Sequence, residues 1–404
     1  MIRLLSSPFL AILLLWAGPL RPASAGFVEK KVWADRDAVD VAFPAADAAG
    51  NAPPTWTVKS FNGRWNATLT LQGDGANAGK PHAPGKVKEV KAKGKKALSK
   101  KAGGRSWTLA NPGVLTLTPV DSIAYPDGSV FDPENGCLKW ELTLDAAPPR
   151  GPPSTATNAV WVCSLELPAG AQAFYQPPLT QAEVDLHASR PSWCVGSYAI
   201  FTADGLKLFH LPRPYASDAK GAWTWGRIEI APDLSTLTVS FPWAWLEDPA
   251  RKYPVVVDPT FGYTTTPATN GALTGGRVDT IGPYSPGSSG TTDSISWYLT
   301  GTNTVTFGLY NESGGVPSSR LVDTAGGDLS GGGWNTRSTD SAASLTGGSN
   351  YWIAFHSDPA DGDAACRYDL VARTLYYPSA TYVDGQVPDP HPGTSPTQGN
   401  LSLG

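Results

Sequence analysis

The chain has 404 residues, a formal net charge of −4 at pH 7 and 16% charged residues, with 43 glycines, 37 prolines and 15 tryptophans. This length allows two or three domains and a core that needs no disulfides. The near-neutral charge gives no overall argument for binding to nucleic acid or anionic membranes, and the abundance of Gly, Pro, Trp and Thr favours β-structure.

The first 25 residues have the three-part pattern of a secretory signal peptide. Arg3 precedes an apolar run that ends at Trp16, and small residues lead up to Ala25. This pattern predicts cleavage after Ala25. A membrane anchor is the alternative, but the apolar run is short and prolines lie within and after it. We therefore expect a secreted or cell-surface protein without a transmembrane segment in its mature part.

Alternating apolar and polar residues over 27–78 predict the first strands of an N-terminal β-rich module, residues 26–260. A lysine-rich insertion interrupts it at about 79–105, with nine lysines and a single acid, Glu89. This composition is typical of a solvated, disordered loop. The loop either contacts an anionic polymer, such as acidic polysaccharide, wall polymer or extracellular DNA, or has no partner. It has no aromatic residue for base stacking, so we expect no sequence-specific nucleic acid.

Strand patterns resume after the insertion, and residues 181–187 could form one short helix. The module is expected to close with a strand at 253–257, where three consecutive valines indicate burial on both faces. Pro259 ends that strand. Asp258 and Thr260 are expected to form the exit turn, so the short linker predicts two modules that touch and hold a fixed angle.

From residue 261 the composition shifts to Gly, Ser and Thr, with short strands separated by turn signals. This pattern predicts a jelly-roll-like β-sandwich over 261–380. The tail, 381–404, is rich in Pro, Gly and Thr and could add a final edge strand. The expected fold class is therefore all-β, with two β-sandwich or jelly-roll-like modules in tandem.

Four stretches follow one another along the chain: FYQPPLT (174–180), CVGSYAIF (194–201), LFHLPRPYASDAKGAWTWG (208–226) and YPVVVDPTFGYTTT (253–266). Their order resembles that in a recurring type of secreted bacterial or phage modular β protein. In that group a YPVxxDPT-terminated module precedes a jelly-roll-like module, which residues 290–356 also resemble. The resemblance implies an extracellular, structural or adhesive protein and carries no catalytic residues. The lysine-rich insertion departs from the pattern, and so does the signal peptide when compared with phage members.

Cys137 and Cys163 are the candidates for a disulfide, because export permits oxidation and both lie in neighbouring strand-like runs. Buried thiols are the alternative. Neither a CxxC motif nor a Cys/His cluster occurs, so a structural zinc site is not expected.

Catalytic motifs are missing: the sequence has no G-x-S-x-G, HExxH, Walker A or Rossmann fingerprint. Asp132 and Glu134 are the nearest approach to the paired carboxylates of a glycosidase, although their stretch, FDPENG, predicts a turn.

Asp358, Asp361 and Asp363 in SDPADGD could offer oxygens to Ca²⁺, although their spacing does not match an EF-hand. A solvated turn is the alternative reading. No other cofactor is expected.

Trp223 and Trp225 lie two apart in a predicted strand and would share one face. On an exposed face they would form a platform for stacking sugars, whereas on a buried face they would be core. The same alternatives hold for Trp243, Trp245, Tyr298, Tyr310, Trp334, Trp352 and Phe355.

These features favour a secreted extracellular or cell-surface structural or adhesion protein that acts by binding or assembly, with glycans, wall polymers, other surface proteins or further copies as partners. A carbohydrate-binding protein with its site on the C-terminal jelly roll is the alternative, and a glycan-active enzyme is the third reading. An exposed aromatic strip would favour the second, and an exposed sheet edge would favour assembly.

Overall fold

The computed structural model describes most of residues 122–393, and parts of the chain on either side. The predicted signal peptide lies outside the described residues. Short gaps within 122–393 fall at 134–136, 151–154, 186, 204, 206, 263–265, 274, 287, 330 and 362–363. The other described segments are 27–31, 40–44, 51–52, 55–60, 65–71, 85–90, 104–108, 114–120 and 398–403.

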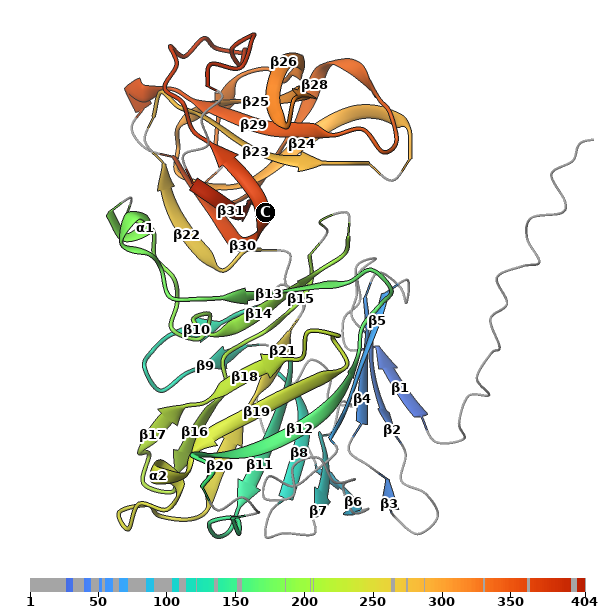
Figure 1. Ribbon diagram of the computed structural model, residues 1–404, viewed down its shortest axis with the longest axis vertical. Coiled ribbons are helices and arrows are strands. Elements are labelled where there is room, and N and C mark those ends of the chain that lie inside the picture. The colour runs from blue at the N-terminus through green and yellow to red at the C-terminus, as the bar shows by residue number, and fades with distance from the viewer. Residues whose placement is uncertain are drawn as a thin grey trace, which may run out of the picture.

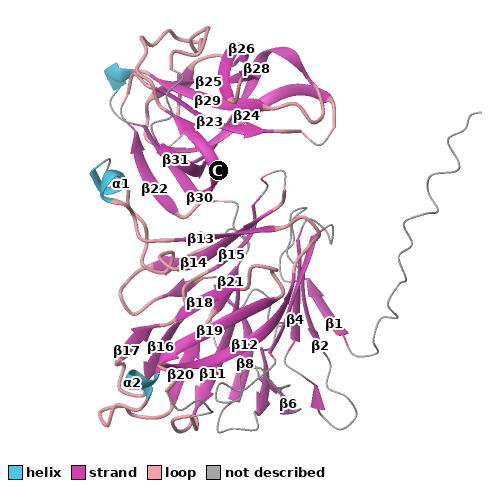
Figure 2. Ribbon diagram, viewed as in Figure 1, coloured by secondary structure: helices cyan, strands magenta, loops and turns pink. Residues whose placement is uncertain are grey.

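The described chain consists mainly of antiparallel strands joined by turns, which confirms the all-β class (Figure 2). Its helical segments are α1 (Gln181–Asp185), α2 (Trp243–Leu246) and a 3-10 turn at Pro359–Asp361. The short helix expected near 181–187 is therefore present. Among the described residues, no helix is both long and apolar enough to cross a membrane.

The N-terminal module, drawn in the lower part of Figure 1, packs two large sheets against each other. The first sheet has the order β1 (Phe27–Lys31), β2 (Asp40–Pro44), β4 (Thr55–Ser60), β5 (Trp65–Leu71), β12 (Asn158–Glu166), β19 (Thr236–Pro242), β18 (Arg227–Ile230). The second has the order β13 (Gln172–Gln176), β14 (Ser197–Phe201), β15 (Lys207–Leu211), β21 (Thr260–Gly262), β11 (Cys137–Leu144), β8 (Val114–Val120), β7 (Gly104–Thr108), β6 (Gly85–Val90), β3 (Asn51–Ala52). β16 (Tyr215–Asp218), β17 (Trp223–Trp225) and β20 (Val255–Asp258) extend this sheet, and β9 (Ile123–Ala124) pairs with β10 (Val130–Phe131).

The period-two pattern of β12 explains how the two sheets meet. Its alternate residues, from Ala159 to Leu165, are buried, while those between them are partly exposed. The buried side chains, including Trp161, pack against Trp140 and Val257 of the opposite sheet in one hydrophobic core. Alternation of this kind places one face of a strand in the core and leaves the other toward solvent.

The lysine-rich insertion is partly ordered, which the sequence did not predict. Strands β6 and β7 fall within or overlap it and pair with each other, and β7 pairs in turn with β8. Residues 91–103, which hold many of the lysines, lie outside the described part of the chain.

The end of the N-terminal module differs from the expected boundary at 260/261. Val255 and Val257 of β20 are fully buried on one face of the strand, whereas Val256 on the other face is only partly buried, so the expected burial of the valines on both faces is incomplete. However, β21 follows directly and pairs with β11 and β15, so residues 260–262 belong to the N-terminal sheet. Asp258 is a buried residue of β20 whose carboxylate lies 2.7 Å from the Lys139 ammonium, and not part of an exit turn.

The C-terminal module forms a second β body around its own core, which includes Trp297, Phe307 and Phe355. Its strand order is β26 (Val316–Asp323), β25 (Thr304–Ser313), β29 (Tyr351–Ser357), β23 (Val278–Tyr284), β30 (Ala364–Tyr376), β24 (Gly290–Thr300), β28 (Gly333–Leu345). Strand β22 (Thr269–Leu273) pairs with β30, and β27 (Gly327–Asp328) pairs with β25. The possible final strand of the tail is β31 (Gln398–Leu403), which also pairs with β30.

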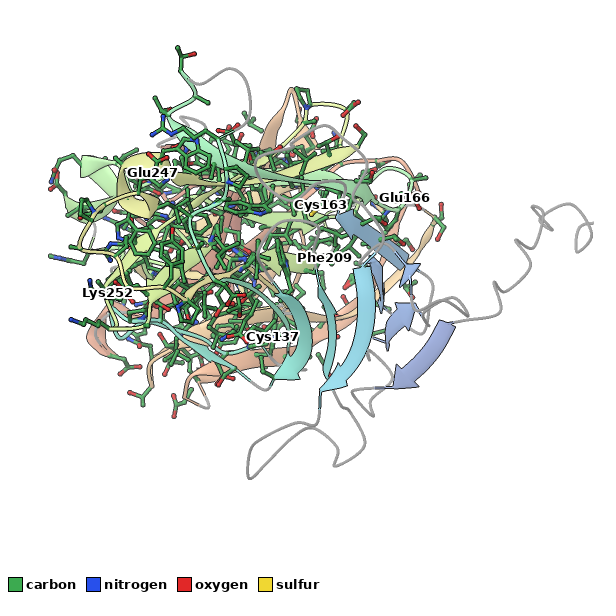
Figure 3. The ribbon with its side chains drawn as sticks, turned by 90° about the horizontal axis from the view of Figure 1, so that it is seen from below. Cys137, Cys163, Glu166, Phe209, Glu247 and Lys252 are labelled. Carbon is green, nitrogen blue, oxygen red and sulfur yellow. The ribbon has the colours of Figure 1, made fainter. Side chains whose placement is uncertain are left out.

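The expected disulfide between Cys137 and Cys163 is wrong. Cys137 lies on β11 of one sheet and Cys163 on β12 of the other, and they belong to different hydrophobic clusters. Figure 3 shows the two labelled residues well apart. All four cysteines, including Cys194 and Cys366, are buried thiols, and burial raises the pKa of Cys163 to about 12.

Candidate functional site

The two modules meet along β13 and β15 on one side and β30 on the other (Figure 1). The ammonium of Lys207 on β15 lies 2.6 Å from the carboxylate of Asp369 on β30, and both side chains are buried. Burial alone would raise the pKa of Asp369, but Lys207 lowers it below its ordinary value, so the pair is charged. A buried ion pair requires both of its partners, because loss of one leaves an uncompensated charge.

The same ion pair fixes the segment that connects the modules. Lys207 Nζ donates to the Thr266 carbonyl at 3.0 Å, and the Ala268 amide donates to the Asp369 carboxylate at 2.9 Å. The connection is therefore held from both modules at once.

A buried glutamine adds a second polar link across this junction. The Gln176 side chain donates to the Leu370 carbonyl at 3.1 Å and accepts from the Leu370 amide at 2.9 Å. It therefore makes the two backbone hydrogen bonds that a neighbouring strand would make with Leu370. Beside it Phe174, Phe201 and Val371 form an apolar contact. The contact between modules that the short linker predicts is present.

The first turn of α1 also takes part in the junction. Thr180 and Glu183 form a capping box, in which each side chain accepts from the backbone amide of the other. The Glu183 carboxylate also accepts a hydrogen bond from the Tyr368 hydroxyl of the C-terminal module at 2.8 Å. Burial would raise the pKa of Glu183, but these hydrogen bonds lower it below the ordinary value.

A buried Ser–His pair lies beside the junction. Ser197 Oγ is 2.7 Å from His210 Nε2, the spacing of a nucleophile and its base, and 3.7 Å from the Cys194 thiol. Burial lowers the pKa of His210 to about 3 and raises that of Cys194 to about 12, so both side chains are neutral. All three residues are fully buried. This cluster is therefore sealed from substrate and serves to join β14 and β15.

The rings of Phe131 and Trp193 pack against His210, with centroid distances of 6.2 and 5.1 Å. Phe131 and Trp193 also line a cavity of about 500 Å³ between the modules, which we call the junction pocket. Asp132 and Arg190 reach it from the N-terminal module, and Asn270 and Arg367 from the C-terminal module; residues 266–268 of the connecting segment complete it. Asp132 is the one carboxylate among the described residues that line this pocket.

An aromatic row leads from the surface to this pocket across three neighbouring strands. Trp334 on β28 lies opposite Tyr298 on β24, and their rings meet edge to face with centroids 5.7 Å apart. The Arg367 guanidinium of β30 lies 5.4 Å from the centre of the Tyr298 ring. Trp334 is 40% exposed. We call these three residues the cross-strand row; it begins at an exposed indole and ends at the junction pocket.

The aromatic residues that the sequence singled out separate into two groups. Trp334 and Tyr298 lie together in the cross-strand row. The prediction that Trp352 binds ligand is wrong, because this residue is fully buried and its ring centroid lies 5.3 Å from that of Tyr376. Tyr310 and Phe355 are core residues as well.

Trp223 and Trp225 lie on β17 of the N-terminal module, where both are partly buried. Their rings meet edge to face at 5.5 Å. Trp225 also packs against Tyr125 at 5.3 Å and beneath the guanidinium of Arg213 at 5.0 Å. The pair therefore forms a packed aromatic cluster and does not extend the cross-strand row.

The stretch PWAWL does not form the expected strand. Trp243 and Trp245 belong to α2, so residues two apart point in different directions. Trp243 is buried, while Trp245 is partly buried with the Arg251 guanidinium 4.6 Å from its ring centre. The prediction that both indoles share one face is wrong here, because side chains repeat every 3.6 residues in a helix and every two residues in a strand.

The first two carboxylates of the acidic loop SDPADGD accept backbone hydrogen bonds, one within the turn and one from the start of β25. Asp358 accepts from the Ala360 amide at 2.9 Å, and Asp361 accepts from the Thr304 amide at 3.1 Å. Asp363 lies outside the described residues, as does Glu134 of the FDPENG pair. In the described part of the chain, no three His, Cys, Asp or Glu side chains gather as metal ligands. A calcium-dependent rise in melting temperature that Asp361→Ala removes would support the proposed calcium site, and no rise would refute it.

Sequence reasoning missed the junction pocket and the polar cluster beside it. One signal was available: Lys207 and His210 interrupt the otherwise apolar run KLFHL, and a charge inside an apolar strand calls for a buried partner. The partner, Asp369, could not be chosen without the fold.

Comparison of the chain with models of known protein families and with curated proteins finds no match.

Proposed function

We propose that the protein is a secreted structural or adhesion protein of the extracellular space or cell surface, which acts by binding. The observation that carries this proposal is the buried junction: Lys207, Asp369 and Gln176 join two β modules into a single body. The junction also brings together a pocket and an exposed aromatic row, which are features suited to recognition. The extracellular location rests on the signal-peptide pattern of residues 1–25, and the resemblance to secreted modular β proteins supports it.

A carbohydrate-binding function is the second candidate, with its site on a C-terminal module that we propose to be jelly-roll-like. The specific observation in its favour is Trp334, a partly exposed indole held edge to face by Tyr298. An indole fixed in this way offers an apolar face to a sugar ring at small entropic cost, because its own motion is already restricted.

Two measurements test the proposal. Expression with the native leader should place the protein outside the cytoplasm with Gly26 as its first residue; a retained, uncleaved cytoplasmic chain would contradict secretion. The secreted protein is then applied to a glycan array and to immobilised cell-wall material. Trp334→Ala should weaken glycan binding, whereas Tyr175→Ala, which removes an equally exposed aromatic from the other module, should not. Equal binding by both variants would contradict a carbohydrate site at Trp334.

A further inference from the structure

We propose that the junction pocket binds an acidic sugar of monosaccharide size, whose carboxylate is held by Arg190 and Arg367. This inference deepens the proposed binding function and rests on it. The pocket volume of about 500 Å³ lies within the range of small-molecule sites, about 300–1,000 Å³.

Two guanidinium groups carry the proposal, because Arg190 of the N-terminal module and Arg367 of the C-terminal module both line the pocket. Arg190 Nε donates a hydrogen bond to the Thr269 hydroxyl at 2.7 Å, and its Nη1 donates to the Pro177 carbonyl. Among the described residues, the pocket lining therefore carries two guanidinium charges against the single carboxylate of Asp132. This excess of positive charge favours an anionic ligand, and planar guanidinium groups match carboxylate oxygens.

The remaining polar groups of the pocket indicate which kind of anion fits. Asp132 lines the same cavity and is exposed. Its carboxylate would repel a doubly charged phosphate, but it would accept hydrogen bonds from sugar hydroxyls. Asn270 adds an amide that can both donate and accept. One carboxylate with several hydroxyls, as in a uronic acid, suits this combination better than an inorganic oxyanion.

The cross-strand row extends the same site toward the surface. Arg367 belongs to both, because it lines the pocket and stacks over Tyr298, which in turn contacts Trp334. An acidic residue in the pocket would therefore leave the next residue of an oligosaccharide near an exposed indole. The pocket is assembled from both modules, so ligand should also stabilise their docked arrangement by mass action.

The test uses the full mature chain and calorimetric titration with oligomers of galacturonate and glucuronate, their neutral methyl esters and inorganic phosphate. The acidic oligomers should bind at least about 10-fold more tightly than the esters, and Arg367→Gln should weaken them about 10- to 100-fold, as for loss of a charged hydrogen bond. Arg227→Gln is the matched control, because it removes the same charge from an exposed site on β18 and should leave binding unchanged. Asp132→Asn, at an exposed position, should admit phosphate while the wild type does not. Thermal unfolding of each variant verifies its fold.

The proposal is overturned if the esters bind as tightly as the acids, if Arg367→Gln binds like the wild type, or if phosphate competes as well as the sugar acid. Failure of the pocket and failure of the proposed function differ in outcome. Binding of a neutral glycan that Trp334→Ala removes would overturn the pocket and preserve the carbohydrate-binding function. Adhesion to surfaces without any glycan binding would overturn both of these and preserve the adhesion function.

Discussion

Removal of one charge from the junction should destabilise the protein strongly. In Asp369→Ala, Lys207 keeps its ammonium in a side chain that is only 5% exposed, with the Thr266 carbonyl as its remaining contact. Breaking one partner of a buried ion pair typically costs about 3–5 kcal/mol. The amide of Ala268 also loses its acceptor, so we expect the upper part of that range.

Urea unfolding, followed by tryptophan fluorescence and circular dichroism, measures this loss. Two controls separate the buried pair from a general effect of charge. Lys207→Met/Asp369→Leu removes both charges and should recover most of the lost free energy of unfolding. Arg227→Ala breaks an exposed ion pair with Glu229 and should change stability by less than about 1 kcal/mol. A loss of less than about 1 kcal/mol in Asp369→Ala would refute the role assigned to the pair.

Three further predictions concern buried groups. Burial raises the pKa of Asp279 to about 7, from 3.8, so this carboxyl should lower the unfolding free energy by on the order of 4 kcal/mol as pH rises from 4 to 7. Burial also raises the pKa values of Asp258 and Asp323 to about 6, so Asp279→Asn should reduce the pH dependence by about that amount without abolishing it; equal pH dependence in both proteins would contradict the prediction. Trp352→Ala should lose about 3–5 kcal/mol in urea unfolding, whereas Trp334→Ala should lose far less; similar losses would disprove their assigned burial. Because the four cysteines are buried thiols, a thiol reagent should react with Cys163 only after denaturation. A reductant should leave the melting temperature unchanged, and a drop in that temperature would indicate a disulfide.

Local patterns were sufficient for much of the fold. Alternation along β12 indicated a strand and its buried face, and the three valines of β20 indicated a strand, because side-chain period is a short-range property of a strand. The valines did not show that Val256 would be only partly buried. The same reasoning failed at Trp243 and Trp245, where tertiary packing converts a strand-like run into the helical turn α2.

The candidate site depended on contacts that no local pattern contains. Gln176 and Leu370 are 194 residues apart in the chain, and nothing in either segment specifies the other. Tyr298 and Trp334 meet because β24 and β28 pair in one particular register, and a shift by one residue would place them on opposite faces. Composition identified the tryptophans as candidates, but only the fold separated exposed Trp334 from buried Trp352.

The central claim is that the buried junction holds the two modules as one rigid body. Pulsed electron paramagnetic resonance tests it directly, with spin labels on Glu229→Cys of the N-terminal module and Ser338→Cys of the C-terminal module, both exposed positions. The native thiols are buried and should stay unlabelled. We predict one narrow distance distribution, which broadens when Asp369→Ala is added. A broad distribution in the protein with the native junction would show that the modules move independently and would contradict the account.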